Sequence, residues 1–324
     1  MKTIVTLAIA ICCCFLNNAQ TIEKFSIDSG GASVTAAGID MLYTIGEVNI
    51  QELSVGNVQV SEGFINADFR VLIHPIVFLQ GPILNPSTPG LMNDDLRVNA
   101  LIPTTSPYAD NATVNATVFD VTGNDAIVDW VWLELRASDD NSRLINARSA
   151  LVQRDGDVVD TDGVSNVIMQ ASSTSYYVVI KHRNHLGVMS LATIGLSDNT
   201  TTVVDFTNSA FATFGNNAQA ELDANTVALW SGDVNASNSI TFSGTNNDVN
   251  AIKDYVLLDP MNVLNFITFS STGYLNEDLD LNGFARFSGS PNDSNIIKDN
   301  VLNHPLNFLN LPTYNINTTV PAQN

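Results

Sequence analysis

Cysteine and positive charge are both scarce in this chain of 324 residues. All three cysteines lie at positions 12–14, so the chain beyond them can form neither disulfides nor thiolate metal sites. Lysine and arginine number 13 against 33 aspartates and glutamates, for a formal charge of −20. Nucleic acid and anionic lipid both require a basic surface, so this composition argues against either as a partner.

Glutamate is scarce as well, with 7 residues against 26 aspartates. Helix-rich proteins favour glutamate, whereas turns, helix caps and calcium loops favour aspartate. Beyond the N-terminus, no segment is long and apolar enough to predict a transmembrane helix. The composition therefore indicates a loop-rich chain with oxygen ligands available for cations.

The N-terminus has the pattern of a secretory signal peptide. Met1 and Lys2 precede an apolar run from Ile4 to Leu16, which is too short to span a bilayer, and Ala19 is a small residue where cleavage is expected. We predict a signal peptide over 1–19, and hence a secreted, extracellular or cell-surface protein. A lipoprotein is the second interpretation because of the cysteines, but Ile11 is not the small residue that lipid attachment requires before the first of them.

Short alternating apolar segments predict a mainly β fold. Residues 20–70 are expected to form an N-terminal β segment, and residues 71–210 an antiparallel β-sandwich. The expected sandwich strands include Thr113–Phe119, Ile127–Leu135, Ser175–His182 and Thr201–Phe206. After residue 220 the apolar spacing becomes helical, with helices expected after Asp248 and after Asp293 and stopped by Pro260 and Pro305.

Two oxygen-rich segments near the C-terminus repeat each other with an offset of 45 residues. In an EF-hand-type loop the ligands come from positions 1, 3, 5, 7 and 9, with position 7 using its carbonyl, and a carboxylate at position 12 closes the loop. Here the closing carboxylate comes four residues late, at position 16. The predicted calcium ligands are Asp233, Asn235, Ser237, Ser239 and Asp248 in the first loop and Asp278, Asp280, Asn282, Phe284 and Asp293 in the second.

A simpler hypothesis makes these segments two Asx-turns in front of two helices, with Asp248 and Asp293 acting only as N-caps. A cap needs one aspartate, and the repetition of every ligand position favours two structural calcium sites instead. Ser237 is a weaker ligand than Asn282, so we expect the first site to bind less tightly. Chelation is expected to destabilise residues 220–310 and to affect the sandwich less.

This duplicated loop–helix unit resembles a dockerin-type calcium module over residues 230–305. It departs from that family at position 12, where Gly244 and Gly289 replace a carboxylate. The segment Leu229-Trp-Ser-Gly-Asp-Val-Asn235 and the central Asp129-Trp-Val-Trp-Leu-Glu-Leu-Arg136 are similar to segments of secreted Bacteroidetes surface proteins, often labelled haemagglutinins or adhesins. The resemblance implies a dockerin-like module over 220–310. Residues 311–324 are expected from the sequence to form a flexible tail.

Three further groups of residues invite a functional interpretation. The run from Asp155 to Asp162 fits an acidic hairpin turn better than a third calcium site. His182 and His185 can share a metal only if the chain turns at Asn184, so structural hydrogen bonds are the preferred interpretation over zinc or catalysis. Asp129 and Glu134 have a spacing that puts them on opposite faces of a regular strand, so we favour an ion pair between Glu134 and Arg136 over a glycosidase carboxylate pair.

We therefore expect a non-catalytic binding, adhesion or assembly protein that calcium stabilises and that binds a protein or glycan ligand at the cell surface. The alternative is a carbohydrate-active enzyme or an accessory carbohydrate-binding component, by analogy with the proteins that carry dockerins. Exposed tryptophans at 130 or 132 beside a carboxylate pair would favour the enzyme, and buried ones the binding module.

Overall fold

The computed structural model describes residues 30–36, 39–45, 51–55, 58–62 and 69–324. The predicted signal peptide over 1–19 lies outside these residues. The chain divides into two compact units, Met1–Asp68 and Phe69–Asn324. The predicted sandwich and repeat regions therefore belong to one compact unit.

The described part of the first unit consists of two antiparallel hairpins. Strand β1 (Gly30–Ala36) pairs with β2 (Ile39–Ile45), and β3 (Gln51–Val55) pairs with β4 (Val58–Glu62). These strands lie in the segment where the sequence predicts β structure.

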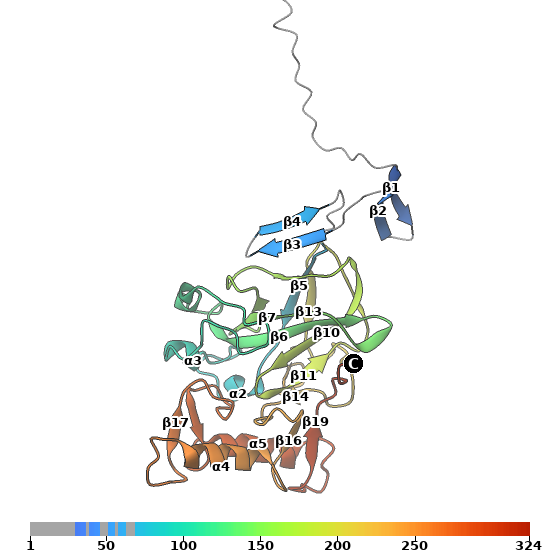
Figure 1. Cartoon of the computed structure of the whole chain (residues 1–324). Coiled ribbons are helices and arrows are strands. Elements are labelled where there is room, and N and C mark those ends of the chain that lie inside the picture. Colours follow the sequence, from blue (N-terminus) through green and yellow to red (C-terminus); the bar gives the residue numbers. More distant parts are fainter. Residues whose placement is uncertain (1–29, 37–38, 46–50, 56–57, 63–68) are drawn as a thin grey trace, which may run out of the picture. The chain divides into compact units, whose positions relative to one another are not determined.

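A six-stranded antiparallel sheet is the centre of the second unit (Figure 1). Its strand order is β11-β10-β6-β7-β8, and β12 pairs with the other end of β10. The strands are β6 (Ile127–Ala137), β7 (Asp140–Gln153), β8 (Val158–Val159), β10 (Thr174–His182), β11 (His185–Met189) and β12 (Ile194–Leu196). The two long apolar strands predicted from the sequence, β6 and β10, are thus neighbours in the middle of this sheet.

A second sheet contributes to the same hydrophobic core. In it β5 (Val71–Ile76) lies between β9 (Val167–Met169), which is antiparallel to it, and β13 (Thr202–Asp205), which is parallel. Ile73 and Val204 from this sheet and Leu133 from β6 are fully buried in one cluster. The prediction of a mainly β fold with antiparallel sheets is confirmed.

The strand predicted at Thr113–Phe119 is wrong. Residues Ala116–Asp120 form the 3-10 helix η1, because the side chain of Asn115 accepts a hydrogen bond from the Thr117 amide and closes a turn. Val114, Ala116 and Val118 alternate in this segment, but only Val118 is buried. Two further short helices, α2 (Gln80–Ile83) and α3 (Asp95–Val98), lie in the connection between β5 and β6.

The repeat region contains two helices of equal length, α4 (Asp248–Leu258) and α5 (Asp293–Asn303), which pack against one another (Figure 1). Each ends two residues before the predicted stop, Pro260 for α4 and Pro305 for α5. Their apolar faces share a core that includes Ile252, Val256, Ile297 and Val301. The short strands of this region are β14 (Ala220–Glu221), β15 (Val227–Ala228), β16 (Ser239–Thr241), β17 (Ser270–Thr272), β18 (Phe284–Arg286) and β19 (Asn315–Asn317).

The two repeats exchange strands. β16 of the first repeat pairs with β19 at the end of the second, and β18 of the second repeat pairs with β17 at the end of the first. The registers correspond, because Ser239 lies opposite Asn317 just as Phe284 lies opposite Thr272. The prediction of a flexible tail over 311–324 is therefore wrong, since β19 is paired and Ile316 lies in the shared core.

The repeat region is bound to the main sheet through the turn between β10 and β11 and through α2. The Asn184 carbonyl accepts from the Gly232 amide, and the Asn184 side chain donates to the carbonyls of Asn276 and Asp278, the latter at 2.8 Å. Gln80 exchanges two hydrogen bonds of 2.8 Å with Asn300 of α5. Among the described residues, no helix has the length and apolar character needed to cross a membrane.

Candidate metal centre

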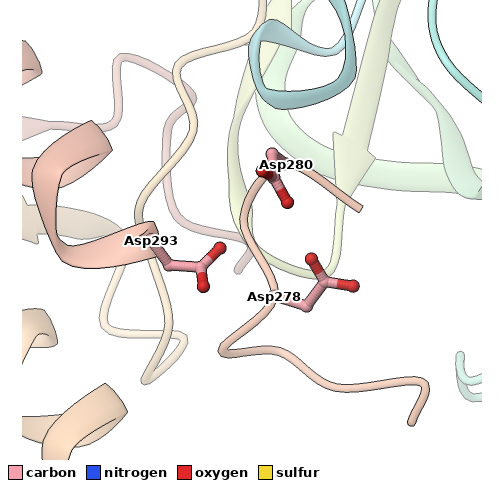
Figure 2. Close-up of side chains that lie close together, drawn as sticks. All are labelled: Asp278, Asp280 and Asp293. Carbon is pink, nitrogen blue, oxygen red and sulfur yellow. The ribbon is translucent and has the colours of Figure 1, made fainter. Parts of the chain in front are cut away.

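Three carboxylates converge in the second loop. Oxygen atoms of Asp278, Asp280 and Asp293 lie within 4.8 Å of one another. Figure 2 shows Asp278 and Asp280 on the loop and Asp293 at the start of α5, with its carboxylate directed toward the other two. Asp278 and Asp293 are buried, and Asp280 is half-buried. The predicted positions 1, 3 and 16 are thus brought together.

Backbone amides hold these carboxylates in place, and the first loop repeats the arrangement. Asp293 accepts from the amides of Leu279 and Arg286 at 2.8 and 2.7 Å. Asp248, its counterpart 45 residues earlier, accepts from the amides of Val234 and Thr241 at 3.0 and 2.8 Å. The position of the closing carboxylate is therefore the same in both loops.

The first aspartate of each loop also has matching partners. Asp278 accepts from the amides of Asn282 and Gly283, and Asp233 accepts from those of Ser237 and Asn238. Gly283 and Asn238 both have positive φ, 90° and 62°, which glycine and asparagine tolerate better than other residues. The sixth position of each loop, Asn238 or Gly283, therefore has a similar backbone conformation although the residue differs.

Asp248 and Asp293 do not serve as the N-caps of their helices. The caps are Asn247 and Asn292, whose side chains accept from the amides of Asn250 and Asn295. The carboxylates one residue later face the preceding loop instead. This observation contradicts the hypothesis that the two aspartates are only caps.

Burial and mutual repulsion raise the pKa values of these carboxyl groups. Burial raises the pKa of Asp293 to about 7, with a further contribution from the charge of Asp280. Burial and the charge of Asp293 raise the pKa of Asp278 well above its usual range. In the first loop, burial and the charge of Asp248 raise the pKa of Asp233 to about 6. Backbone hydrogen bonds to these carboxylates lower their pKa values, but by less than burial and charge repulsion raise them.

The chemistry of the donors fits a hard divalent cation, since every predicted ligand is an oxygen. The second loop offers three carboxylates, whereas the first offers two, with Asn235 in place of Asp280. Ser237 and Asn282 lie on the loops, with Ser237 Oγ 3.5 Å from Asp233 Oδ1. Ser239 and Phe284, the predicted carbonyl ligands, are the first residues of β16 and β18.

The acidic run from Asp155 to Asp162 forms turns, and its carboxylates have separate partners. Asp157 pairs with His74 at 3.1 Å, and Asp160 pairs with Arg148 at 2.5 Å. Asp162 accepts from the amides of Val164 and Ser165. In the described part of the chain these groups do not gather around a common point, and the hairpin interpretation is the one that agrees with the structure.

His182 and His185 do come together, because the chain turns at Arg183 and Asn184 between β10 and β11. Their Nδ1 atoms are 2.9 Å apart, and His182 Nε2 lies 3.1 Å from the buried Asp129. The Gly81 amide donates to His185 Nε2, so the proton of the neutral His185 ring is on Nδ1, where Asn184 Oδ1 accepts it at 2.8 Å and His182 Nδ1 lies 2.9 Å away. Burial lowers the pKa of both histidines, so both rings are neutral. The arrangement is a buried hydrogen-bond chain, as the preferred interpretation expected.

Asp129 and Glu134, the two carboxylates of β6, also form ion pairs. Glu134 pairs with Arg136 at 2.8 Å, which confirms the ion pair predicted on one face of the strand, and with Lys181 at 2.5 Å. Burial alone would raise the pKa of Asp129, but the charge of Arg183 and the hydrogen bond from His182 lower it to about 2. Burial also acts to raise the pKa of Glu134, but the hydrogen bonds and charges of Lys181 and Arg136 lower it, and the net shift is downward.

Sequence reasoning missed several contacts that hold the centre. Tyr274 donates to Asp129 at 2.6 Å, and the Arg183 guanidinium lies 4.2 Å from the centre of the Tyr274 ring. These contacts join β6 and the β10–β11 turn to the segment that leads into the second loop. They connect residues 145 positions apart, and no local pattern signals them.

Comparisons with known proteins identified no relative. No family model, no curated protein and no solved structure matches this chain. The resemblance to dockerin-type modules stays a prediction from the sequence.

The raised pKa of Asp293 predicts an unusual pH dependence when calcium is absent. The folded state holds the Asp293 proton more tightly than the unfolded chain, so this group stabilises the calcium-free protein at low pH, and the stabilisation is lost as pH rises through about 7. His182 and His185 act in the opposite direction, because burial lowers their pKa values. We therefore expect melting temperatures in EDTA between pH 5 and 8 to decline more steeply for the native chain than for Asp293→Asn. Equal slopes would contradict this assignment.

Proposed function

We propose that this chain is a secreted or cell-surface protein with a non-catalytic binding, adhesion or assembly role, and that its C-terminal repeat binds two calcium ions as structural cofactors. The observation that carries the proposal is the repetition, at an offset of 45 residues, of the backbone hydrogen bonds that fix Asp233 and Asp248 in one loop and Asp278 and Asp293 in the other.

The electrostatics support a cation in both loops. Buried carboxylates that face one another destabilise the fold when they are ionised, unless a positive charge lies between them. No lysine or arginine forms an ion pair with Asp278, Asp280 or Asp293 among the described contacts. A bound divalent cation supplies the missing charge and takes the place of the protons that burial otherwise retains.

The non-catalytic part of the proposal rests on the carboxylates of β6. A glycosidase acid needs a raised pKa so that it remains protonated at neutral pH. The pKa values of Asp129 and Glu134 are both lowered, and each carboxylate is held by cationic partners. Trp130 is fully buried, which favours a binding module, whereas the half-buried Trp132 beside Glu134 is the one feature that favours the enzyme.

We expect the purified mature chain to show no turnover of polysaccharides. The reason is that neither β6 carboxylate can deliver a proton at neutral pH. Reducing-sugar release from a panel of plant, fungal and bacterial polysaccharides measures this. Reproducible release that Glu134→Gln abolishes would establish the enzyme instead.

Calcium titration of the mature full-length chain tests the proposal directly. We expect two binding events in calorimetry, the tighter one lost in Asp278→Ala and the weaker one in Asp233→Ala, because the second loop has one more carboxylate. Asp293→Asn retains one oxygen ligand, so it should weaken binding less than Asp293→Ala. If no heat of binding appears at millimolar calcium in a folded sample, the loops are hydrogen-bonded turns and the proposal is wrong.

A further inference from the structure

A cavity of about 410 Å³ lies between the main sheet and the first loop. It is bordered by Tyr108, Trp132 and Lys181 on one side and by Asp233, Ala236 and Asn238 on the other. A second hollow of about 370 Å³ shares Lys181 and Asn238 with it. The two together form a groove, here called the loop-1 groove, and each is within the size range of small-molecule sites.

The aromatic lining of the loop-1 groove is packed against its neighbours and partly open. Trp132 is half-buried, unlike Trp130, which lies two residues earlier on β6 and is completely buried. The ring of Trp132 is 5.5 Å from that of Tyr108, with 36° between their planes, and its indole nitrogen donates to Glu134 at 3.1 Å. An aromatic surface in a cavity lined by both apolar and polar side chains suits a ligand with one apolar and one polar face.

The charges of the loop-1 groove nearly cancel. Lys181 and Arg136 share the carboxylate of Glu134 at 2.5 and 2.8 Å, Arg183 is paired with Asp129 at 3.0 Å, and Asp233 adds a further carboxylate. His182 and His185 are neutral, because burial lowers their pKa values. A phosphorylated or sulfated ligand would find no unpaired cation among the described lining residues. The groove instead offers hydrogen-bonding groups, including the exposed amides of Asn238 and Gln323.

The first loop forms one wall of the groove, and its conformation depends on Asp233. Ala236 and Asn238 have positive φ angles of 54° and 62°. Asp233 fixes them through hydrogen bonds from the Ser237 and Asn238 amides, and Asp233 itself lines the cavity. A cation bound by Asp233 would therefore lie in the wall of the groove, beside the residues that these hydrogen bonds hold.

From these observations we infer that the loop-1 groove binds a neutral oligosaccharide, with a sugar ring stacked on Trp132 and hydroxyls bonded to the surrounding amides and the Glu134–Lys181 pair. Calcium in the first loop orders the wall and so strengthens binding. The calcium dependence rests on the proposed function, whereas the stacking on Trp132 does not.

The test uses the mature full-length chain and a panel of neutral and sulfated oligosaccharides, followed by tryptophan fluorescence and calorimetry. We expect binding of a neutral member, with affinity at least tenfold lower in Trp132→Ala. Phe308→Ala, which removes an exposed ring outside the groove, is the matched control and should bind normally. Asn238→Gly removes an amide but keeps the positive φ, as Gly283 does in the second loop, so it tests the groove without disturbing the fold.

The outcomes separate the two proposals. Binding that EDTA and Asp233→Ala weaken, and that Phe308→Ala leaves unchanged, supports the inference. If calcium binds to both loops but no neutral oligosaccharide binds at millimolar concentration, or if Trp132→Ala and Asn238→Gly bind as well as the native chain, the inference is wrong while the calcium proposal stands. A preference for sulfated sugars or for a peptide would also overturn it.

Discussion

Removing calcium with EDTA should lower the melting temperature of residues 69–324 by roughly 10–20 °C. At a calcium concentration a hundred times the dissociation constant, each site contributes about 2.7 kcal/mol, and about 1 kcal/mol shifts the melting temperature of a unit of this size by roughly 2–4 °C. The sequence predicts that the sheet would be affected less than the repeats. The structure changes that expectation, because Asn184 and Gln80 join the two parts within one compact unit.

Circular dichroism and tryptophan fluorescence should therefore report one common transition, with and without calcium. Trp130 lies in the core of the sheet and Trp230 in the core of the repeats, so fluorescence covers both. The double variant Asp233→Ala, Asp278→Ala is the control and should melt at the same temperature in calcium and in EDTA. If the native chain also melts at the same temperature in calcium and in EDTA, calcium does not stabilise this protein.

Replacing Gly81 with alanine should destabilise the protein by about 3 kcal/mol and weaken calcium binding at the second loop. A Cβ atom at this position would lie 1.7 Å from the Leu279 carbonyl oxygen, so either α2 or the loop must move. Leu279 lies between Asp278 and Asp280, and its amide donates to Asp293. A displacement there disturbs three predicted ligands at once.

The control for this substitution is Gly195→Ala, where the new methyl group meets no atom closer than 3.9 Å. Urea unfolding measures the loss of stability, and calcium calorimetry measures the two sites separately. We expect Gly81→Ala to affect the tighter site more than the weaker one. Equal stability of the two variants would show that the second loop does not depend on its contact with α2.

The repeat was visible in the sequence because its predicted ligands and helices recur at one offset, and each helix begins within one residue of the predicted position and ends before the predicted proline. The sequence did not reveal the contacts between segments that lie far apart in the chain. The pairing of β16 with β19 joins segments that are 76 residues apart at Ile240 and Ile316, and the alternation of a strand as short as Asn315–Asn317 covers only three residues. The turn Asn307–Asn310 repeats Asn262–Asn265, with Asn262 and Asn307 bonded alike to helix carbonyls, so extending the comparison would have revealed the tail as structured.

The N-cap residues of the two helices also could not be assigned from the sequence. Asn247 and Asp248 can both cap a helix, and composition does not choose between them. In the structure the Asn247 side chain accepts from the Asn250 amide, which leaves the Asp248 carboxylate free to bind the loop. Likewise, the alternating residues after Thr113 suit a strand, but the local turn at Asn115 prevails because its side chain satisfies the Thr117 amide.

A crystal structure of residues 20–324 grown in millimolar calcium is the decisive test of the two calcium sites. The account predicts anomalous density for one ion in each loop. In the second loop, oxygens of Asp278, Asp280 and Asp293 should lie about 2.3–2.6 Å from the ion. Well-ordered loops with no ion in either, and with the aspartates bonded only to the backbone amides that hold them here, would contradict it.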